Sequence, residues 1–100
     1  MAEWSLYLVR TCRGALYTGI ATDVARRLGE HAGGGPRGSR YLRAQAPLLL
    51  VYQVRLGSRA LASRAEHRVK RLPKRTKERL VADAPAAARL LELLGLTPAS

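Results

Sequence analysis

Apolar and polar positions alternate with different periods along the chain, and the first twenty residues show the pattern of a β-hairpin. Residues 4–10 are rich in aromatic and branched side chains, which favours a strand. Residues 11–14 follow as a short turn that ends in glycine, and residues 15–20 form a second strand-like run. The two runs are expected to pair as antiparallel strands. Side chains alternate faces along each strand, but the sequence leaves the register of the pairing open.

A helical pattern begins directly after this predicted hairpin. Thr22 and Asp23 are the candidate N-caps, because their short side chains can accept hydrogen bonds from the first free backbone amides of a helix. Apolar residues then recur at helical spacing until the glycines at 33–35, which are expected to end the helix. Residues 32–40 combine glycine, proline and arginine, and this composition predicts a flexible, basic loop.

The second half of the chain predicts one strand and then a helix. Residues 48–55 form a nearly continuous apolar run, which indicates a central strand of a sheet. Ser58 can cap a helix whose apolar residues recur at helical spacing as far as Leu72. Pro73 cannot donate a backbone hydrogen bond, so this helix is expected to end or bend before it.

Two shorter helices complete the prediction, over residues 74–82 and 86–94. Asp83 or Ala84, next to a proline, is expected to open the last helix, and Gly95 is expected to stop it. The order of elements is therefore strand, strand, helix, strand, helix, helix, helix. This order predicts an α/β fold of the α+β kind, with a small three-stranded antiparallel sheet flanked by helices.

Length and composition indicate one compact domain, because 100 residues leave no room for a second core. Residues 1–82 are expected to form this domain, and residues 83–100 to add a C-terminal helix that packs on it and a frayed tail. There is no run of about 18 apolar residues that could span a membrane. Residues 1–4 do not resemble a signal peptide, and the lone Cys12 cannot form an internal disulfide. These features favour the cytoplasm.

The distribution of charge is the first indication of function. The chain has 18 Lys and Arg against seven Asp and Glu, a net charge of +11. Between Arg37 and Arg79 there are 13 basic residues and only two acidic ones, Glu66 and Glu78. A basic surplus confined to one segment is typical of a surface that binds a polyanion such as nucleic acid. The alternative is a solubilising surface in an arginine-rich proteome.

Two short motifs on the predicted hairpin point to a nuclease family. Ser5-Leu6-Tyr7 precedes Tyr17-Thr18-Gly19 by ten residues, from tyrosine to tyrosine. Arg27 follows Gly19 by eight residues on the next helix, and Glu66 lies on a later one. In this order and spacing, the residues resemble the GIY-YIG nucleases over about residues 4–80. The chain also resembles the short stand-alone bacterial proteins of the YhbQ type within that family, which likewise end in a basic segment rich in Lys and Arg.

The resemblance implies a role for each of these side chains, in a reaction that hydrolyses a phosphodiester bond. Glu66 would hold one divalent cation, Mg²⁺ or Mn²⁺, since carboxylates and water are the ligands Mg²⁺ prefers. Arg27 would hold the scissile phosphate in its planar guanidinium. Tyr17 would act as the general base for water or position it. Tyr7 would orient the water or the phosphate, and His31 would assist.

Helix geometry bears on the same residues independently of the family. At about 100° per residue, Arg27 and His31 lie on or beside the apolar stripe of their helix, whereas Arg26 faces solvent. Arg27 and His31 can therefore point along the sheet towards the tyrosines. On its own helix Glu66 lies at the edge of the apolar stripe, next to Ala62 on the same side. A carboxylate at such an edge can reach a cleft without being fully buried.

Substrate binding is expected to rest on contacts with phosphate groups, which position a nucleic acid without reading its sequence. The candidate residues for these contacts are Arg37, Arg40, Arg43, Lys70, Lys74 and Lys77. DNA is favoured over RNA, no membrane partner is expected, and a monomer is the default state. With no room for an additional DNA-targeting domain, we expect low sequence specificity.

Each candidate also has a purely structural interpretation. Strand tyrosines are commonly packing residues, a lone Arg27 is commonly solvated, and His31 could simply lie at a helix end. Glu66 could be a salt-bridge partner of Arg59, Arg64 or Lys70. The chain also departs from the family pattern, with Ser5 where glycine is usual and no clear counterpart of a common asparagine after the acidic helix.

Three hypotheses follow. The first is a divalent-metal-dependent endonuclease that cuts DNA, structure- or damage-directed, with low sequence specificity and a place in repair or recombination. The second is a nucleic-acid-binding module that has the same fold and little or no catalytic turnover. The third is a protein without catalytic activity whose basic helices dock onto an acidic partner or an RNA–protein particle.

Overall fold

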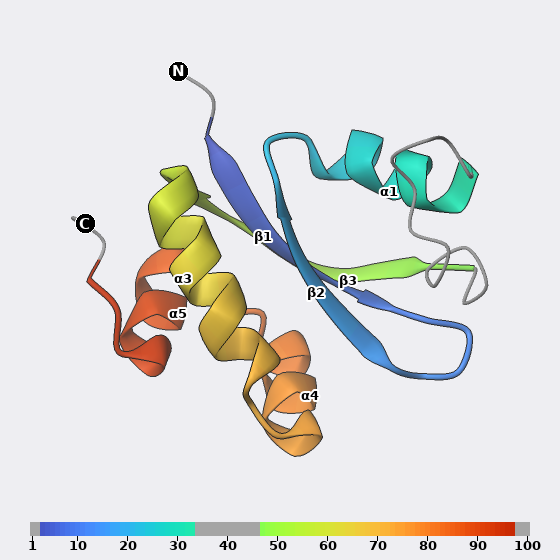
Figure 1. Cartoon of the computed structure of the whole chain (residues 1–100). Coiled ribbons are helices and arrows are strands. Elements are labelled where there is room, and N and C mark those ends of the chain that lie inside the picture. Colours follow the sequence, from blue (N-terminus) through green and yellow to red (C-terminus); the bar gives the residue numbers. More distant parts are fainter. Residues whose placement is uncertain (1–2, 34–46, 98–100) are drawn as a thin grey trace.

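A computed structural model describes residues 3–33 and 47–97, with the backbone alone at 31–33. The elements follow the predicted order of strand, strand, helix, strand and three helices (Figure 1). They are β1 (Trp4–Arg10), β2 (Leu16–Ala21), α1 (Val24–Gly33), β3 (Leu49–Gly57), α3 (Arg59–Lys70), α4 (Lys74–Asp83) and α5 (Ala87–Leu94). The prediction of an α+β fold with a three-stranded antiparallel sheet is confirmed. Most of the predicted loop at 32–40 lies outside the described residues, as do Arg37, Arg40 and Arg43.

The order of strands in the sheet is β2-β1-β3, so the prediction that residues 48–55 form the central strand is wrong. The central strand is β1, whose residues Leu6–Val9 are all buried. In β3 the side chain of Leu49 is 62% exposed, and Gln53 and Arg55 are exposed as well. An apolar run indicates that a strand is partly buried. It does not indicate the position of that strand in the sheet, because such a run can lie at the centre or at an edge.

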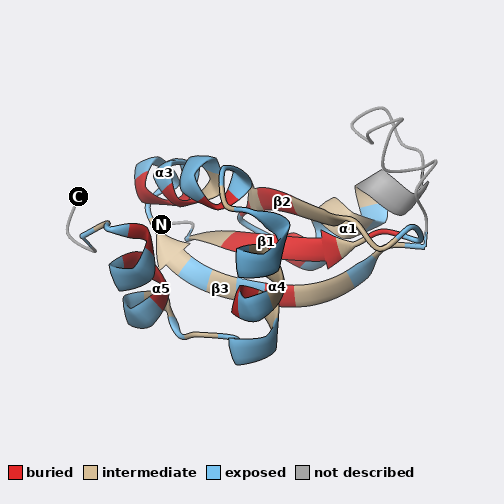
Figure 2. Ribbon diagram, turned by 90° about the horizontal axis from the view of Figure 1, so that it is seen from below, coloured by how far each residue is buried: buried red, intermediate tan, exposed pale blue. Residues whose placement is uncertain are grey.

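The two faces of the sheet are covered by different helices. On one face, Leu6 and Leu8 of β1 share a core with residues of α3, α4 and α5. On the other face, Tyr7 and Val9 pack with Val24 of α1. Figure 1 shows α3, α4 and α5 grouped together and α1 set apart from them, and Figure 2 shows the buried residues concentrated along β1 and on the inner sides of the helices. The strand that carries Tyr7 therefore lies between two helical layers.

The ends of the helices show which local signals operate. Asp23, not Thr22, is the cap of α1, since its Oδ1 accepts a hydrogen bond from the Arg26 amide at 3.1 Å. The Ser58 Oγ accepts from the Leu61 amide at 3.1 Å, as predicted for α3. Gly95 ends α5 as predicted, with φ of +72°.

Two predicted helix ends are wrong by a few residues. The helix predicted to continue to Leu72 ends at Lys70, and Leu72 packs on the core from the turn that follows. Neither Asp83 nor Ala84 opens the last helix: Asp83 is the last residue of α4, and Ala84, with φ of +44°, is its C-cap. The extended residue Ala86 then precedes α5. The left-handed turn at Ala84 separates two helices that the sequence pattern joins closely.

Polar contacts connect α4, α5 and the turn between them to the rest of the structure. The Tyr52 hydroxyl of β3 donates a hydrogen bond to the Pro85 carbonyl at 2.6 Å. The Arg68 guanidinium donates to the Leu94 carbonyl at 2.7 Å. Arg10 and Glu78 form a bidentate ion pair with distances of 2.7 and 2.8 Å. Bidentate pairs between arginine and carboxylate are among the most directional polar contacts in proteins, so β1 and α4 are held in a defined orientation.

Candidate active site

The hairpin register brings the two motif tyrosines to one face of the sheet. Tyr7 pairs with Gly19, and Val9 pairs with Tyr17. Directly paired residues of an antiparallel sheet point to the same face, and so do residues two apart along a strand. Tyr7 and Tyr17 therefore lie diagonally across β1 and β2 on the face that α1 covers. The sequence left this point open, and the register decides it.

Gly19 allows the Tyr7 ring to cross the neighbouring strand. A Cβ atom built on Gly19 would lie 2.5 Å from both Cζ and Oη of Tyr7. No real side chain tolerates such a distance, so the ring occupies the space where any other residue would carry its Cβ atom. Gly19 is not in the left-handed region, unlike Gly14, Gly57 and Gly95. The second motif therefore requires glycine because any side chain at this position would collide with the Tyr7 ring. The ring passes over Gly19, and this path directs the Tyr7 hydroxyl towards the β2 edge of the sheet.

Three other candidate residues surround the Tyr7 hydroxyl. The pKa of Tyr7 is raised from 10.0 to about 12, first by burial and then by the neighbouring Tyr17. The Arg27 guanidinium, which hydrogen-bonds the Tyr7 side chain, opposes the rise, and the Glu66 carboxylate adds to it. Tyr7 is therefore a neutral phenol at physiological pH. It can orient a ligand through hydrogen bonds, but it is not suited to remove a proton from water.

Arg27 reaches this group from α1. Its Nη1 donates to Glu30 Oε1 at 3.1 Å, and its side chain also contacts Tyr7. The neighbouring Arg26 is twice as exposed, at 70% against 35%, and makes only a longer 3.7 Å pair with Glu30. This placement agrees with the helix geometry, which directed Arg27 inward and Arg26 to solvent. The side chain of His31, on the same helix, lies outside the described residues.

Glu66 reaches the same place from the other side of the sheet. It lies on α3, which packs against β1 and β2 on the face opposite α1. Its side chain is 24% exposed and pairs with Lys70 at 3.3 Å. Because β2 is an edge strand, groups on opposite faces can meet around it without passing through the sheet. Tyr7, Tyr17, Arg27 and Glu66 thus converge at the β2 edge from four different elements.

The other acidic residue of the basic segment has a different role. Glu78 is held by Arg10, and the hydrogen bonds from that guanidinium lower the pKa of its carboxyl group. Glu78 is therefore occupied in joining α4 to β1. Of the two acids between Arg37 and Arg79, Glu66 is the one placed beside the tyrosines.

The donor set at the β2 edge fits a divalent cation held by a single carboxylate. Among the described side chains, those of residues 3–30 and 47–97, no three from His, Cys, Asp or Glu gather closely enough to form a metal cage. Mg²⁺ does not require one, since it commonly binds through one or two carboxylates, several waters and the phosphates of its substrate. Glu66, partly exposed, can serve as such a ligand.

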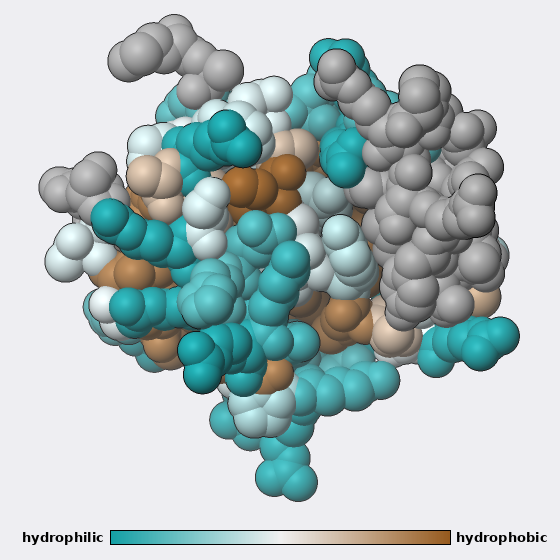
Figure 3. Space-filling model, in the orientation of Figure 1, coloured by the Kyte–Doolittle hydropathy of each residue, from teal (hydrophilic) through white to brown (hydrophobic). Residues whose placement is uncertain are grey.

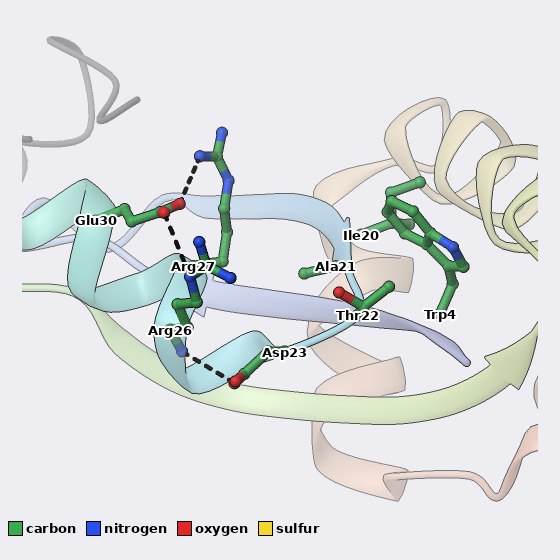
Figure 4. A pocket seen from close by; sticks show the side chains of 8 residues that line it. All are labelled: Trp4, Ile20, Ala21, Thr22, Asp23, Arg26, Arg27 and Glu30. Atoms are coloured by element: carbon green, nitrogen blue, oxygen red, sulfur yellow. Dashed lines mark hydrogen bonds and ion pairs between the residues drawn. The ribbon is translucent and has the colours of Figure 1, made fainter. Parts of the chain in front are cut away.

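A shallow hollow of about 300 Å³ adjoins these residues (Figure 4). It lies where β2 ends and α1 begins, and Arg27 is the one residue of the converging group that lines it. Its lining consists of Trp4, Ile20, Ala21, Thr22, Asp23, Arg26, Arg27 and Glu30. Sequence reasoning assigned no role to Trp4 or Glu30. The spacing of Glu30, three residues after Arg27 on one helix, could have indicated that pairing, but no local signal places Trp4 near α1.

Of the candidate phosphate-binding residues, Lys70 lies on α3 and Lys74 and Lys77 lie on α4, while the three arginines lie outside the described residues. Lys70 pairs with Glu66, while the Lys74 ammonium donates to the Gly14 carbonyl at 3.1 Å and so contacts the hairpin turn. Lys77 is partly buried. Figure 3 shows hydrophilic side chains gathered over α3 and α4 on this face. The exposed cations from α3 through α4 are Arg59, Arg64, Arg68, Lys70, Arg71, Lys74, Arg75 and Arg79.

The neutral phenol of Tyr7 gives a prediction that depends only on burial. The pKa of Tyr7 in the folded protein lies above the ordinary value of 10.0. The contribution of this phenol to the stability of the fold is therefore complete below pH 10 and is lost as the pH rises towards about 12. Tyr52, whose pKa burial also raises to about 12, behaves in the same way. In a titration followed by phenolate absorbance, Tyr7→Phe and Tyr52→Phe are each expected to remove one late-titrating phenol. The interpretation fails for Tyr7 if Tyr7→Phe leaves the late amplitude of the folded protein unchanged.

Comparison with known proteins identifies the family to which this fold belongs. The model of the GIY-YIG catalytic domain matches residues 3–79. The chain belongs to the GIY-YIG family. GIY-YIG domains form a family of nucleases that act on nucleic acid and generally depend on divalent metal ions.

Individual relatives extend over almost the whole chain. The chain is 51% identical over 94 residues to the UPF0213 protein YhbQ of Escherichia coli K12, covering 94% of this chain and 92% of YhbQ. The YhbQ protein of Escherichia coli O157:H7 is 50% identical over the same length. The solution structure of the UPF0213 protein BH0048 from Bacillus halodurans is similar, with 35% identity, a TM-score of 0.54 and coverage of 95% of this chain and 99% of that one. Among the described residues, no helix is both long and apolar enough to cross a membrane.

Proposed function

We propose that this protein is a divalent-metal-dependent endonuclease that hydrolyses phosphodiester bonds in DNA, structure- or damage-directed and with low sequence specificity. The observation that carries the proposal is the convergence of Tyr7, Tyr17, Arg27 and Glu66 from four elements at one edge of the sheet. Each of these side chains also has structural contacts, such as the packing of Tyr7 and the pairing of Glu66 with Lys70. Together they supply what phosphodiester hydrolysis requires.

The reaction joins a water oxygen to phosphorus and breaks the bond between phosphorus and the departing sugar oxygen. Arg27 stabilises the negative charge on the phosphoryl oxygens, because its planar guanidinium can donate two parallel hydrogen bonds to them. Tyr17, which is less buried than Tyr7, accepts the proton of the attacking water or positions that water. Tyr7 remains protonated and orients the phosphate or the water through its hydroxyl.

Glu66 is the proposed metal ligand, and Mg²⁺ or Mn²⁺ as a single ion is the proposed cofactor. When bound, the ion would neutralise charge on the phosphate and the leaving oxygen. In the structure, the partly exposed Lys70 ammonium pairs with the Glu66 carboxylate and balances its charge. Exposed pairs of this kind contribute at most about 1 kcal/mol, so a divalent cation can replace Lys70 at little expense.

The exposed cations of α3 and α4 are the proposed substrate-binding surface. They lie on the same helical layer as Glu66, so a nucleic acid held there passes the β2 edge. Contacts of this type bind phosphate without reading bases, which is why low sequence specificity is expected. Affinity should fall steeply as salt concentration rises.

A nuclease screen with a pair of adjacent arginine variants tests the proposal. The wild type is expected to cut one or more of the branched, flapped, nicked and single-stranded DNA substrates with Mg²⁺ or Mn²⁺, and EDTA should abolish cleavage. Arg27→Ala is expected to lower the cleavage rate by about 10²- to 10³-fold, because it removes donors to the transition state. Arg26→Ala removes the same charge from the same helix, but from a solvent-facing position, and should leave the rate almost unchanged.

The second candidate function, a nucleic-acid-binding module without turnover, is favoured by the pairing of Glu66 with Lys70 and by the departures from the family motifs at Ser5 and after Pro73. It predicts DNA binding with a steep salt dependence and no cleavage of any substrate with any metal. If the purified protein shows no salt-sensitive binding to polyanions at all, both nucleic-acid functions are wrong.

A further inference from the structure

The tryptophan side chain at the start of β1 lies beside the candidate active site. Trp4 is partly exposed and lines the 300 Å³ hollow that also contains Arg27. The Arg59 guanidinium stacks over the indole, 5.2 Å from its centroid. A large aromatic ring that is partly open to solvent and held by an arginine is the arrangement on which nucleobases stack in single-strand-binding proteins.

The walls of the hollow differ in character, and the difference matches the two parts of a nucleotide. Figure 4 shows Trp4 and Ile20 together at one end and the arginines of α1 at the other. The first end offers a ring and an aliphatic side chain, which suit the flat face of a base. The second end offers Arg27, which the proposed reaction assigns to the scissile phosphate.

The acidic residues of the hollow do not oppose this arrangement. Asp23 caps α1 by accepting the Arg26 amide, and Glu30 pairs with both Arg26 and Arg27. Both carboxylates are therefore occupied by groups of α1. The volume of about 300 Å³ is at the small end of the range for ligand pockets, so the hollow has room for one base rather than for a base pair.

We infer that this hollow is a subsite for one unpaired nucleobase next to the scissile phosphate, with Trp4 as the stacking surface and Arg59 as the residue that positions the ring. The inference rests on the proposed function and narrows its substrate class. A base within a continuous duplex has both faces covered by its neighbours and its edge occupied by its partner. Only a base in a single strand, flap, gap or branch point can offer a free face to Trp4. The preferred substrate is therefore a nucleic acid with an unpaired nucleotide at the cleavage position.

Trp4 is the only tryptophan of the chain, so its fluorescence reports on this subsite directly. Wild-type protein is titrated in EDTA, where no substrate is consumed, with a short oligothymidylate, with a fully paired, blunt-ended two-strand duplex of equal phosphate count, and with inorganic polyphosphate. The oligothymidylate is expected to quench the fluorescence substantially, because stacking places a base against the indole. The duplex and the polyphosphate are expected to bind without comparable quenching. Equal quenching by either one would overturn the inference.

Substitutions at Trp4 provide a second measurement. Trp4→Ala is expected to weaken oligothymidylate binding by about 10- to 100-fold, the usual effect of losing one stacked base. Trp4→Phe should restore most of the affinity, since it keeps an aromatic face, and duplex binding should change little in either variant. If Trp4→Ala fails to fold, the fluorescence titration of the wild type still tests the inference by itself. Affinities that are the same in all three proteins would overturn the inference.

The two proposals can fail separately. Metal-dependent cleavage that is indifferent to Trp4 and to unpaired bases would remove the subsite and leave the nuclease. Base-dependent quenching without cleavage by any metal would keep the subsite and remove the enzymatic reaction.

Discussion

Replacing Glu66 with glutamine is expected to lower the rate of metal-dependent cleavage by at least about 10³-fold, corresponding to several kcal/mol of lost transition-state stabilisation. Glutamine keeps the size and shape of the side chain but loses the negative charge that a hard cation requires. The position is partly exposed, and among the described residues the carboxylate forms an ion pair with the half-exposed Lys70 alone, so the fold should not change. DNA binding in EDTA should be equal or slightly tighter, because the variant removes a negative charge beside the substrate.

A matched substitution separates this effect from a general effect of charge. Glu92 lies on α5, is largely exposed, and also pairs with a basic residue on its own helix, Arg89. Glu92→Gln should leave the cleavage rate at the wild-type value. Initial rates are measured over a range of Mg²⁺ and Mn²⁺ concentrations, with thermal melts to verify folding. A Glu66→Gln protein that cuts as fast as the wild type at ordinary Mg²⁺ concentrations would show that this carboxylate is not the metal ligand.

The second large effect is expected at Gly19. Gly19→Ala places a methyl group where Cζ and Oη of Tyr7 lie at 2.5 Å, and Tyr7 is only 1% exposed, so the ring has no free space into which to move. Overpacking of a buried site typically costs about 1–3 kcal/mol of folding free energy. A shift of the Tyr7 hydroxyl of about 1 Å can reduce catalysis by about 10²-fold. The variant is therefore expected to melt earlier and to lose most of its activity.

The same substitution at a second glycine is expected to act in the opposite direction. A Cβ atom on Gly29, in the exposed part of α1, would meet nothing within 4 Å. Alanine there should stabilise the helix by up to about 1 kcal/mol, because glycine is a poor helix former. Melting temperatures and cleavage rates of the two variants are compared with the wild type. If Gly19→Ala melts and cuts like the wild type, the Tyr7 ring is not held across Gly19 in solution.

Much of the fold could be predicted from local features of the sequence. The alternation of residues 4–10 and 15–20, the cap at Ser58 and the stop at Gly95 all act within a few residues of where they stand. The order of the elements followed from them. The candidate site residues were also found in the sequence, because the distance between Tyr7 and Tyr17 and the position of Arg27 are local to a hairpin and the helix after it.

Other features depend on contacts between distant segments, which no local pattern contains. The apolar run at residues 48–55 suggested a central strand, yet β3 is an edge strand, since pairing order depends on which strands the helices cover. The family resemblance singled out Glu66, but the different role of Glu78 became visible only in its pairing with Arg10, 68 residues away. The neighbourhood of Trp4 and Arg27 likewise arises only when β1 and α1 come together at the β2 edge.

The sequence by itself determined which residues could carry the chemistry, since their types and spacing are read along the chain. The tertiary structure alone decided that they meet. The hairpin register sets Tyr7 and Tyr17 on one face, the bare backbone of Gly19 lets the Tyr7 ring cross to the edge, and the edge position of β2 lets Glu66 approach from the opposite face. The physical reason is that secondary structure follows from short-range hydrogen bonding and hydrophobic period, whereas the arrangement of distant side chains follows from how whole faces of the sheet are buried.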